Sequence, residues 1–299
     1  MGKQEQITKN QHFIPQSYFR EFSASEKGIY RHNVQLPNES SIWVSIGDEC
    51  AEKYLYEMLT EDGELLEPNK LEKVFSQFEA DFSNTIKAIK RKAFNKANYN
   101  TASFLTKEEK QNLLVFISLQ LLRYPEMLKY GQDIAKEVYN NEIDDIQARN
   151  FAIEMYYNSL FRLKNNQEGP NITFSVLKWF DNMAFKIGVS KRDVVITSDL
   201  PMCFYNKKGL YPFEDTPDQV TVPLTSRLVL YLSPMESEER GKRNILFPLT
   251  DDDIHEEHSA MFMMARHWIY SYTPLNKEDI LQLVDDRSFI NDKRKDELL

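Results

Sequence analysis

The chain has 299 residues and a formal net charge of −9, with 41% hydrophobic and 12% aromatic residues. This composition is typical of a globular protein with a substantial core, and it excludes a disordered chain. The negative charge argues against a protein that coats DNA without sequence preference, although it allows a local basic groove.

The sequence also indicates where the protein resides. It has no run of about 18 apolar residues, so we expect neither a membrane span nor a membrane partner. Its first residues lack the apolar stretch of a secretory signal peptide. The only cysteines, Cys50 and Cys203, are too few for a disulfide framework. We therefore expect a cytoplasmic location.

The first predicted elements surround a polar motif near the N-terminus. Pro15 restricts its own backbone and pushes Ile14 toward extended geometry, so His12 is expected on an entering strand or loop. Proline is favourable in a first helical turn, which predicts a short helix over residues 15–22.

Residues 28–60 are expected to contain a hairpin and a helix. Apolar and polar residues alternate over Gly28–Val34 and Ser40–Ile46, which predicts two paired strands joined by a turn. Residues 48–60 are expected to form a helix.

Long helices dominate the middle of the chain. Over residues 67–92, apolar side chains recur at three- and four-residue spacing, which predicts an amphipathic helix. A capping box at Thr106–Glu109 opens a second helix, and Leu113–Leu122 is apolar on every side, which indicates a buried helix. A third helix over residues 131–164 is expected to be interrupted near Asn140–Asn141.

The end of the first long helix carries a cluster of cations, namely Lys87, Lys90, Arg91, Lys92 and Lys96. Cations there complement the helix dipole, so a solvated helix end is favoured over a nucleic-acid patch.

Beyond a polar linker at residues 165–170, the composition shifts toward strands. Strand-like runs occur at Phe185–Gly188, Asp193–Thr197, Thr221–Pro223 and Arg227–Leu232. Residues 212–217 are expected to form a loop. A last helix is expected over residues 252–270.

Together these elements predict an α+β fold that is mainly helical, with a small, mostly antiparallel sheet packed against the helices. We expect a single domain over residues 1–299. It would comprise an N-terminal motif and hairpin (1–66), a helical core (67–164) and an α+β half (171–299).

Four segments, in this order, resemble one protein family. The motif His-x-x-Pro-Gln-x-Tyr-Phe-Arg-x-Phe at residues 12–22 is similar to the opening signature of the domain of unknown function 4238 (DUF4238) family of bacteria and fungi. Residues 120–125, 196–201 and 265–271 are similar to its later motifs, the last of them to a closing helix. The resemblance implies no common activity, but it does imply a link to bacterial antiphage defence, because members occur among such genes.

Common catalytic motifs are absent from the sequence. It has no Walker A motif, no Gly-x-Gly-x-x-Gly and no Gly-x-Ser-x-Gly. The acidic segment Asp251–His258 lacks the spacing of a zinc protease, so it is interpreted as an acidic helix N-terminus, and no metal ligands are assigned.

The polar side chains of the family-like segments, with Glu79 of the first long helix, are expected to line one pocket: His12, Gln16, Arg20, Glu79, Gln120, Arg123, Ser198 and Asp199. In an enzyme, His12 would act as general acid and base, and Arg20 with Arg123 would hold a phosphate. Asp199 would orient His12 or bind a divalent metal ion. Gln16, Glu79, Gln120 and Ser198 would contribute to binding.

Each assignment has a structural alternative. Gln120 and Arg123 could simply tie down the N-terminal segment and a helix end. Asp199 could form a local turn before Pro201.

Two functions remain open at this stage. The first is an antiphage effector of the nuclease or hydrolase class, a toxin acting on nucleic acid in the cytoplasm, with a divalent metal ion as the conceivable cofactor. The alternative is a non-catalytic binding module or sensor for a phage protein or a nucleotide, in which the polar cluster is a structural network. The sequence assigns no oligomeric state.

Overall fold

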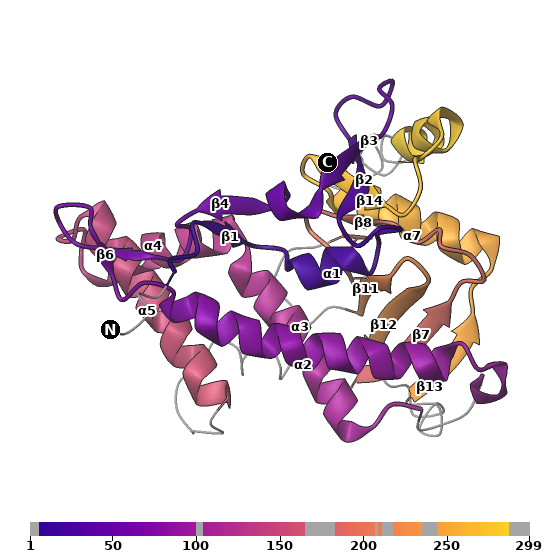
Figure 1. Cartoon of the computed structure of the whole chain (residues 1–299), viewed down its shortest axis with the longest axis horizontal. Coiled ribbons are helices and arrows are strands. Elements are labelled where there is room, and N and C mark those ends of the chain that lie inside the picture. Colours follow the sequence, from indigo (N-terminus) through magenta and orange to yellow (C-terminus); the bar gives the residue numbers. More distant parts are fainter. Residues whose placement is uncertain are drawn as a thin grey trace. The chain divides into compact units, whose positions relative to one another are not determined.

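The computed structural model describes residues 6–99, 104–164, 183–206, 209–210, 218–234 and 244–286 (Figure 1). The chain divides into two compact units, each assembled from separate stretches of sequence. The first unit comprises Met1–Pro15, Cys50–Thr85 and Gln111–Lys178, and the second comprises Gln16–Glu49, Ile86–Lys110 and Trp179–Leu299. These units interleave along the sequence, and the expected single domain with its three blocks stays a prediction.

The first unit is built on helices with short strands beside them. Its elements are β1 (Asn10–His12), β4 (Ala51–Lys53), β5 (Met58–Leu59), β6 (Leu65–Leu66), most of α2 (Lys70–Ala93), most of α3 (Lys107–Arg123), α4 (Pro125–Val138) and α5 (Asp145–Lys164). Strand β1 pairs antiparallel with β4, and β5 pairs antiparallel with β6. His12 therefore lies on a strand, as expected.

One hydrophobic core joins the four long helices of the first unit. Buried side chains from α2, α3, α4 and α5 meet in it, among them Phe75, Leu119, Leu128 and Ile153. The predicted amphipathic and all-apolar patterns of α2 and α3 are thus confirmed as core-facing helices.

Helix boundaries follow local chemistry. The capping box is present, because Thr106 N–H donates to Glu109 Oε2 (2.8 Å) and Glu109 N–H donates to Thr106 Oγ1 (3.1 Å). The predicted interruption between α4 and α5 is confirmed, and Asn140 and Asn141 there have φ values of 50° and 60°. Asparagine tolerates this left-handed conformation better than most residues do.

The helix expected over residues 48–60 is wrong. This stretch holds the end of a 3-10 helix, η1 (Ile46–Asp48), followed by β4 and β5. Cys50 and Tyr54 adopt positive φ values of 49° and 57°, which a right-handed helix excludes. Pairing with the distant β1 overrides local helix propensity here.

Among the described residues, the second unit contains two sheets. One has the order β10-β9-β11-β12-β7-β13 and the other has the order β3-β2-β14-β8. Their strands are β2 (Gly28–Asn33), β3 (Ile42–Ser45), β7 (Met183–Val189), β8 (Thr197–Ser198), β9 (Cys203–Asn206), β10 (Gly209–Leu210), β11 (Gln219–Thr225), β12 (Leu228–Pro234), β13 (Asn244–Pro248) and β14 (Trp268–Ser271). Neighbouring strands are antiparallel except β13 and β7, which are parallel. An α+β fold with mostly antiparallel sheets is therefore confirmed.

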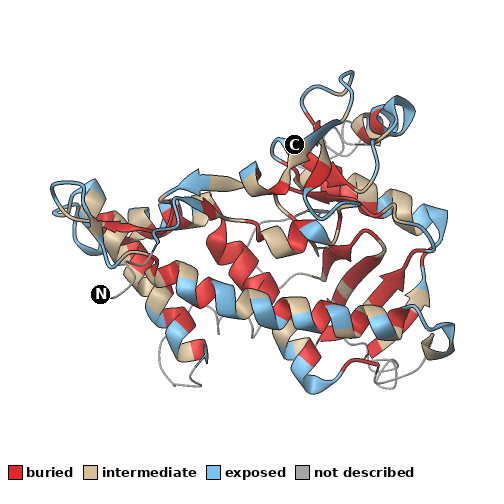
Figure 2. Cartoon of the chain, in the orientation of Figure 1, coloured by how far each residue is buried: buried red, intermediate tan, exposed pale blue. Residues whose placement is uncertain are grey.

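The centre of the larger sheet is buried on both faces. Strands β7, β11 and β12 are almost continuously buried, as Figure 2 shows. The unit also contains the short helix α1 (Gln16–Arg20), the end of α2, the 3-10 helix η2 (Lys96–Asn98) and α7 (Asp251–Met264). The predicted hairpin is confirmed as β2 and β3, and the predicted short helix as α1.

Two expectations for the second unit are wrong at residue level. Helix α7 ends at Met264, and residues 268–271 form β14 between β2 and β8 instead of a closing helix. Residues 194–196 are not in a strand, because only Thr197 and Ser198 pair with β14. The expected linker at 165–170 and the expected loop at 212–217 lie outside the described residues.

None of the helices in the described part of the chain combines the length and the apolar character needed to cross a membrane.

Candidate functional site

Arg123 is the centre of a polar network in the first unit. Its side chain, at the end of α3, is 3% exposed. Nη1 donates to Glu79 Oε1 on α2 at 2.5 Å, and Nη2 donates to the backbone oxygen of His12. The guanidinium carbon lies 4.4 Å from the ring centroid of Phe75, so the charge also contacts an aromatic face.

Gln120 holds the same N-terminal segment. Its Nε2 donates to the backbone oxygen of Phe13 at 2.6 Å, one residue after the carbonyl that Arg123 binds. We call Arg123, Glu79, Gln120 and the backbone of His12 and Phe13 the Arg123 network. Two of its bonds end on the main chain of β1 and the residue after it, as the structural alternative predicts.

A second set of buried groups also fixes this segment. Gln11 Nε2 donates to Glu57 Oε1 at 2.6 Å, and Gln11 Oε1 accepts the backbone N–H of Tyr56 at 2.6 Å. Glu57 further accepts the backbone N–H of Asn69 at 3.0 Å. Sequence reasoning missed Gln11 and Glu57, although Gln11 directly precedes His12, the first residue of the family motif.

The charges of the network shift the pKa values of Arg123 and of the neighbouring Glu72. Burial alone would lower the pKa of Arg123, but the carboxylate of Glu79 raises it, so the guanidinium stays charged. Glu72 lies one helical turn before Phe75 on α2. Its pKa is raised to about 7 by burial, an effect that Arg123 opposes and Glu79 reinforces.

Neither the Arg123 network nor the neighbouring Glu72 is fully satisfied. Among the described residues, Arg123 Nε, Gln120 Oε1 and Glu72 Oε1 are buried without a hydrogen-bond partner. Each such group costs about 1–3 kcal/mol unless water or a ligand meets it.

The other predicted site residues lie in the second unit. Arg20 Nη2 donates to Gln16 Oε1 at 2.9 Å across one turn of α1, on an exposed surface. Ser198 Oγ donates to the backbone oxygen of Leu200 at 2.7 Å, which makes a local turn.

Asp199 binds the backbone that leads into β14. Its carboxylate accepts the N–H groups of Arg266 at 2.9 Å, His267 at 2.8 Å and Trp268 at 3.2 Å. Burial raises the pKa of Asp199, and these three bonds oppose the rise. Asp199 therefore stabilises the junction between α7 and β14.

The predicted residues thus separate by unit. His12, Glu79, Gln120 and Arg123 belong to the first unit, and Gln16, Arg20, Ser198 and Asp199 belong to the second. The expectation of one pocket shared by all of them stays a prediction. Within the described residues, no group of three or more His, Cys, Asp or Glu side chains is arranged to hold a metal ion.

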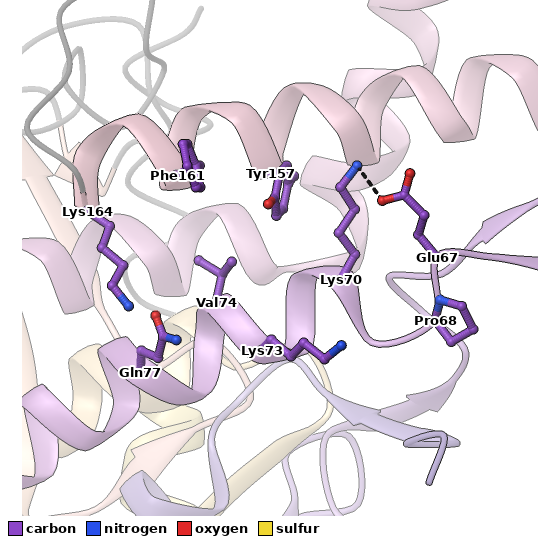
Figure 3. Close-up of a pocket in the computed structure, with 9 residues that line it drawn as sticks. All are labelled: Glu67, Pro68, Lys70, Lys73, Val74, Gln77, Tyr157, Phe161 and Lys164. Atoms are coloured by element: carbon purple, nitrogen blue, oxygen red, sulfur yellow. Dashed lines mark ion pairs between the residues drawn. The ribbon is translucent and has the colours of Figure 1, made fainter. Parts of the chain in front are cut away.

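A hollow of about 620 Å³ lies between α2 and α5 in the first unit (Figure 3). Figure 3 shows Tyr157 and Phe161 reaching from α5 toward Val74 and Gln77 of α2. We call this hollow the α2–α5 groove. Its lining consists of Glu67, Pro68, Lys70, Lys73, Val74, Gln77, Tyr157, Phe161 and Lys164.

The groove combines aromatic rings with positive charge. The rings of Tyr157 and Phe161 stack at 6.0 Å with planes 26° apart. Lys70 Nζ lies 4.4 Å from the Tyr157 ring centroid and pairs with Glu67 at 3.0 Å and Glu154 at 2.7 Å. The lining contains three lysines and one glutamate, so it is positively charged although the chain as a whole is negative. Sequence reasoning missed this groove.

Fold and site together define an α+β protein whose first unit holds both a polar network around the buried Arg123 and an open lysine–aromatic groove. Residues 10–274 match the family described as Protein of unknown function (DUF4238). The chain therefore belongs to the DUF4238 family, which confirms the resemblance seen in its motifs. No curated protein and no solved structure matches it.

Proposed function

We propose that this protein is a non-catalytic binding module that recognises a nucleotide in antiphage defence, with the α2–α5 groove as its binding site. The observation that carries the proposal is the combination of a stacked ring pair and lysines in one hollow. A nucleotide joins an aromatic base to a phosphate group, so it complements both features of the groove.

Different residues of the groove would bind the base and the phosphate of the nucleotide. A base would stack on the exposed side of Phe161 and Tyr157, and the ammonium groups of Lys73 and Lys164 would bind phosphate. Lys70 pairs with Glu67 and Glu154 and lies against the Tyr157 ring, and its role would be to fix that ring in place.

The contacts of the Arg123 network support the non-catalytic part of the proposal. Arg123 and Gln120 use donors to hold backbone carbonyls of the N-terminal segment, a typical task of a buried structural network. The defence role rests on the family resemblance alone, and a cytoplasmic nucleotide signal produced during infection is the class of ligand that it favours.

Nucleotide binding to the groove can be measured by isothermal titration calorimetry with ATP. We expect Lys73→Glu and Phe161→Ala each to weaken ATP binding about tenfold, because one loses a phosphate contact and the other a stacking surface. Lys129→Glu and Tyr130→Ala on α4 are matched controls, since both side chains are exposed outside the groove. Absence of ATP binding, or equal losses in the control variants, would contradict the proposal.

One observation favours the phosphodiester-acting enzyme as a second candidate. Glu72 has a buried oxygen without a partner and a pKa raised to about 7 by burial, which suits proton transfer at neutral pH. In this candidate Glu72 would donate the proton, His12 would keep its expected acid–base role, and Arg123 Nε would hold the phosphate.

The enzyme candidate predicts a rate effect at Glu72. Glu72→Gln is expected to lower hydrolysis of a dinucleotide phosphodiester, whose alkoxide leaving group needs a proton, by about 10²–10⁴-fold. Because a general acid acts while protonated, the wild-type rate should fall as the pH rises through about 7. The exposed Asp81→Asn on the same helix is the control. If wild type does not hydrolyse the substrate, or if both variants behave alike, this candidate is wrong.

A further inference from the structure

The end of α2 in the second unit carries cations of two kinds. Lys90 pairs with Glu21 at 2.7 Å, and Lys92 pairs with Glu109 at 2.6 Å, so these two are neutralised within the protein. Lys87 and Arg91 are exposed, and neither forms an ion pair within the described part of the chain. The solvated helix end expected from the sequence therefore describes only part of this cluster.

An aromatic ring lies among the exposed cations. Phe94 is 42% exposed, and the guanidinium carbon of Arg227 lies 4.3 Å from its ring centroid. Arg227 Nε donates to the backbone oxygen of Ser190 at 3.2 Å, which fixes the guanidinium in place. A hollow of about 460 Å³ beside this ring is lined by Lys87, Lys90, Arg91 and Phe94. We call Lys87, Arg91, Phe94 and Arg227 the basic–aromatic patch.

The patch combines cations with an aromatic ring, which indicates a ligand that carries both phosphates and bases. An exposed phenyl ring contributes nothing to helix capping, whereas a base can stack on its face and on the guanidinium plane. Lys87 and Arg91, four residues apart on one helical face, can bind successive phosphates. Duplex DNA keeps its bases stacked inside, whereas an unpaired strand offers both an accessible base and successive phosphates to the patch.

We propose that the basic–aromatic patch binds single-stranded nucleic acid, with phosphates on Lys87 and Arg91 and a base on Phe94. This site goes beyond the nucleotide groove, because its residues belong to the second unit and its ligand is a polymer. Because the chain as a whole has a net charge of −9, binding is limited to this local region.

Fluorescence anisotropy with a labelled dodecathymidylate tests the patch. We expect the full chain to bind it, and the double variant Lys87→Glu/Arg91→Glu to bind at least about tenfold more weakly. The matched control is Lys27→Glu/Lys277→Glu, which makes the same change in charge at exposed lysines of the same unit. This control should change the affinity less than about threefold.

Salt dependence and stacking provide independent readouts. The slope of log affinity against log salt should fall by about 1.4 in the double variant, for two lost phosphate contacts on a single strand. Phe94→Ala should weaken binding about tenfold with an unchanged slope, and Phe94→Trp should restore it. Oligouridylate in place of the thymidylate tells whether the strand is RNA or DNA.

The inference is overturned if wild type does not bind the single strand, or if the double variant binds like its control. It is equally overturned if a duplex of the same length binds as tightly and Phe94→Ala has no effect, since charge alone would then explain binding. Thermal melting of each variant confirms that it is folded, and the salt slope of the wild-type protein tests the phosphate contacts without any substitution.

Discussion

Replacement of Arg123 by methionine is expected to lower the free energy of unfolding by about 3–5 kcal/mol. The guanidinium is 3% exposed, and it satisfies both Glu79 and the backbone oxygen of His12. Methionine fills much of the volume, but it leaves a carboxylate and a carbonyl without their donors. Removing one partner of a buried pair is costly because the other charge stays desolvated, so a fall of the order of 10 °C in melting temperature should follow.

A double-mutant cycle separates the energy of the Arg123–Glu79 ion pair from the energy of packing the Arg123 side chain. Glu79→Gln removes the charge that Arg123→Met leaves behind, so the double variant should recover part of the loss. Arg192→Met is the control, because its ion pair with Asp251 has side chains 72% and 90% exposed and should contribute less than about 1 kcal/mol. Urea unfolding of the four proteins gives the free energies. A loss for Arg123→Met no larger than for Arg192→Met would show that the network does not stabilise the fold.

The second large effect concerns Glu257 on α7. This residue is 3% exposed, and its Oε1 is buried without a partner. Three tyrosines, Tyr18, Tyr205 and Tyr231, lie within electrostatic range, and no cation among the described residues pairs with it. Burial therefore raises the pKa of Glu257 to about 8, and the side chain is uncharged at neutral pH.

The sign of the pH effect follows from proton binding. Below about pH 4.5, the ordinary value, Glu257 is protonated in the folded and unfolded states alike, so it has no effect on stability. Between 4.5 and about 8 only the folded state keeps the proton, so stability falls by about 1.4 kcal/mol for each unit of rising pH. Above about 8 the loss is complete.

Glu257→Gln should remove this dependence because an amide does not ionise. The variant is expected to exceed wild type by about 4–5 kcal/mol near pH 8, and to equal it near the ordinary pKa. Glu256→Gln, at the exposed neighbouring position, should show no such divergence. Urea unfolding across this pH range provides the comparison, and parallel curves for wild type and Glu257→Gln would refute the argument.

The helices that could be predicted are those whose own sequence contains a helix-specific pattern. Helix α2 carries its stripe in its own sequence, and α3 carries both a capping box and an apolar run. Strand β14 has no comparable signal, because its extended form depends on β2 and β8, which are distant in the sequence. Residues 265–271 continue the polar and apolar spacing of α7, so pattern alone extended that helix too far.

The candidate site likewise contains residues that the sequence could identify and residues that it could not. Gln120 and Arg123 were conspicuous because polar groups in a buried helix need partners, and both proved to bind the N-terminal segment. Glu72 was not selected, although it lies seven residues before Glu79 and therefore on the same helical face. Acidic residues beside an apolar stripe are usually solvated, and only the fold shows that one carboxylate oxygen of Glu72 is buried.

The groove could not be predicted, since its lining comes from helices whose packing no local pattern specifies. Lysines and aromatic residues on α2 and α5 are ordinary helix surface in the sequence, and they form a site only when Tyr157 and Phe161 face Val74 and Gln77. We propose that ligand binding occurs in this groove, while the residues of the family motifs in this unit stabilise the fold.

Photo-crosslinking with 8-azido-ATP, mapped by mass spectrometry, tests this claim most directly because the azide is on the base. The account predicts labelling of the α5 peptide that contains Tyr157 and Phe161, abolished by excess ATP and strongly reduced in Lys73→Glu. Labelling confined to the segment around His12 or to the end of α3 around Arg123 would contradict it and would place the ligand at the polar network.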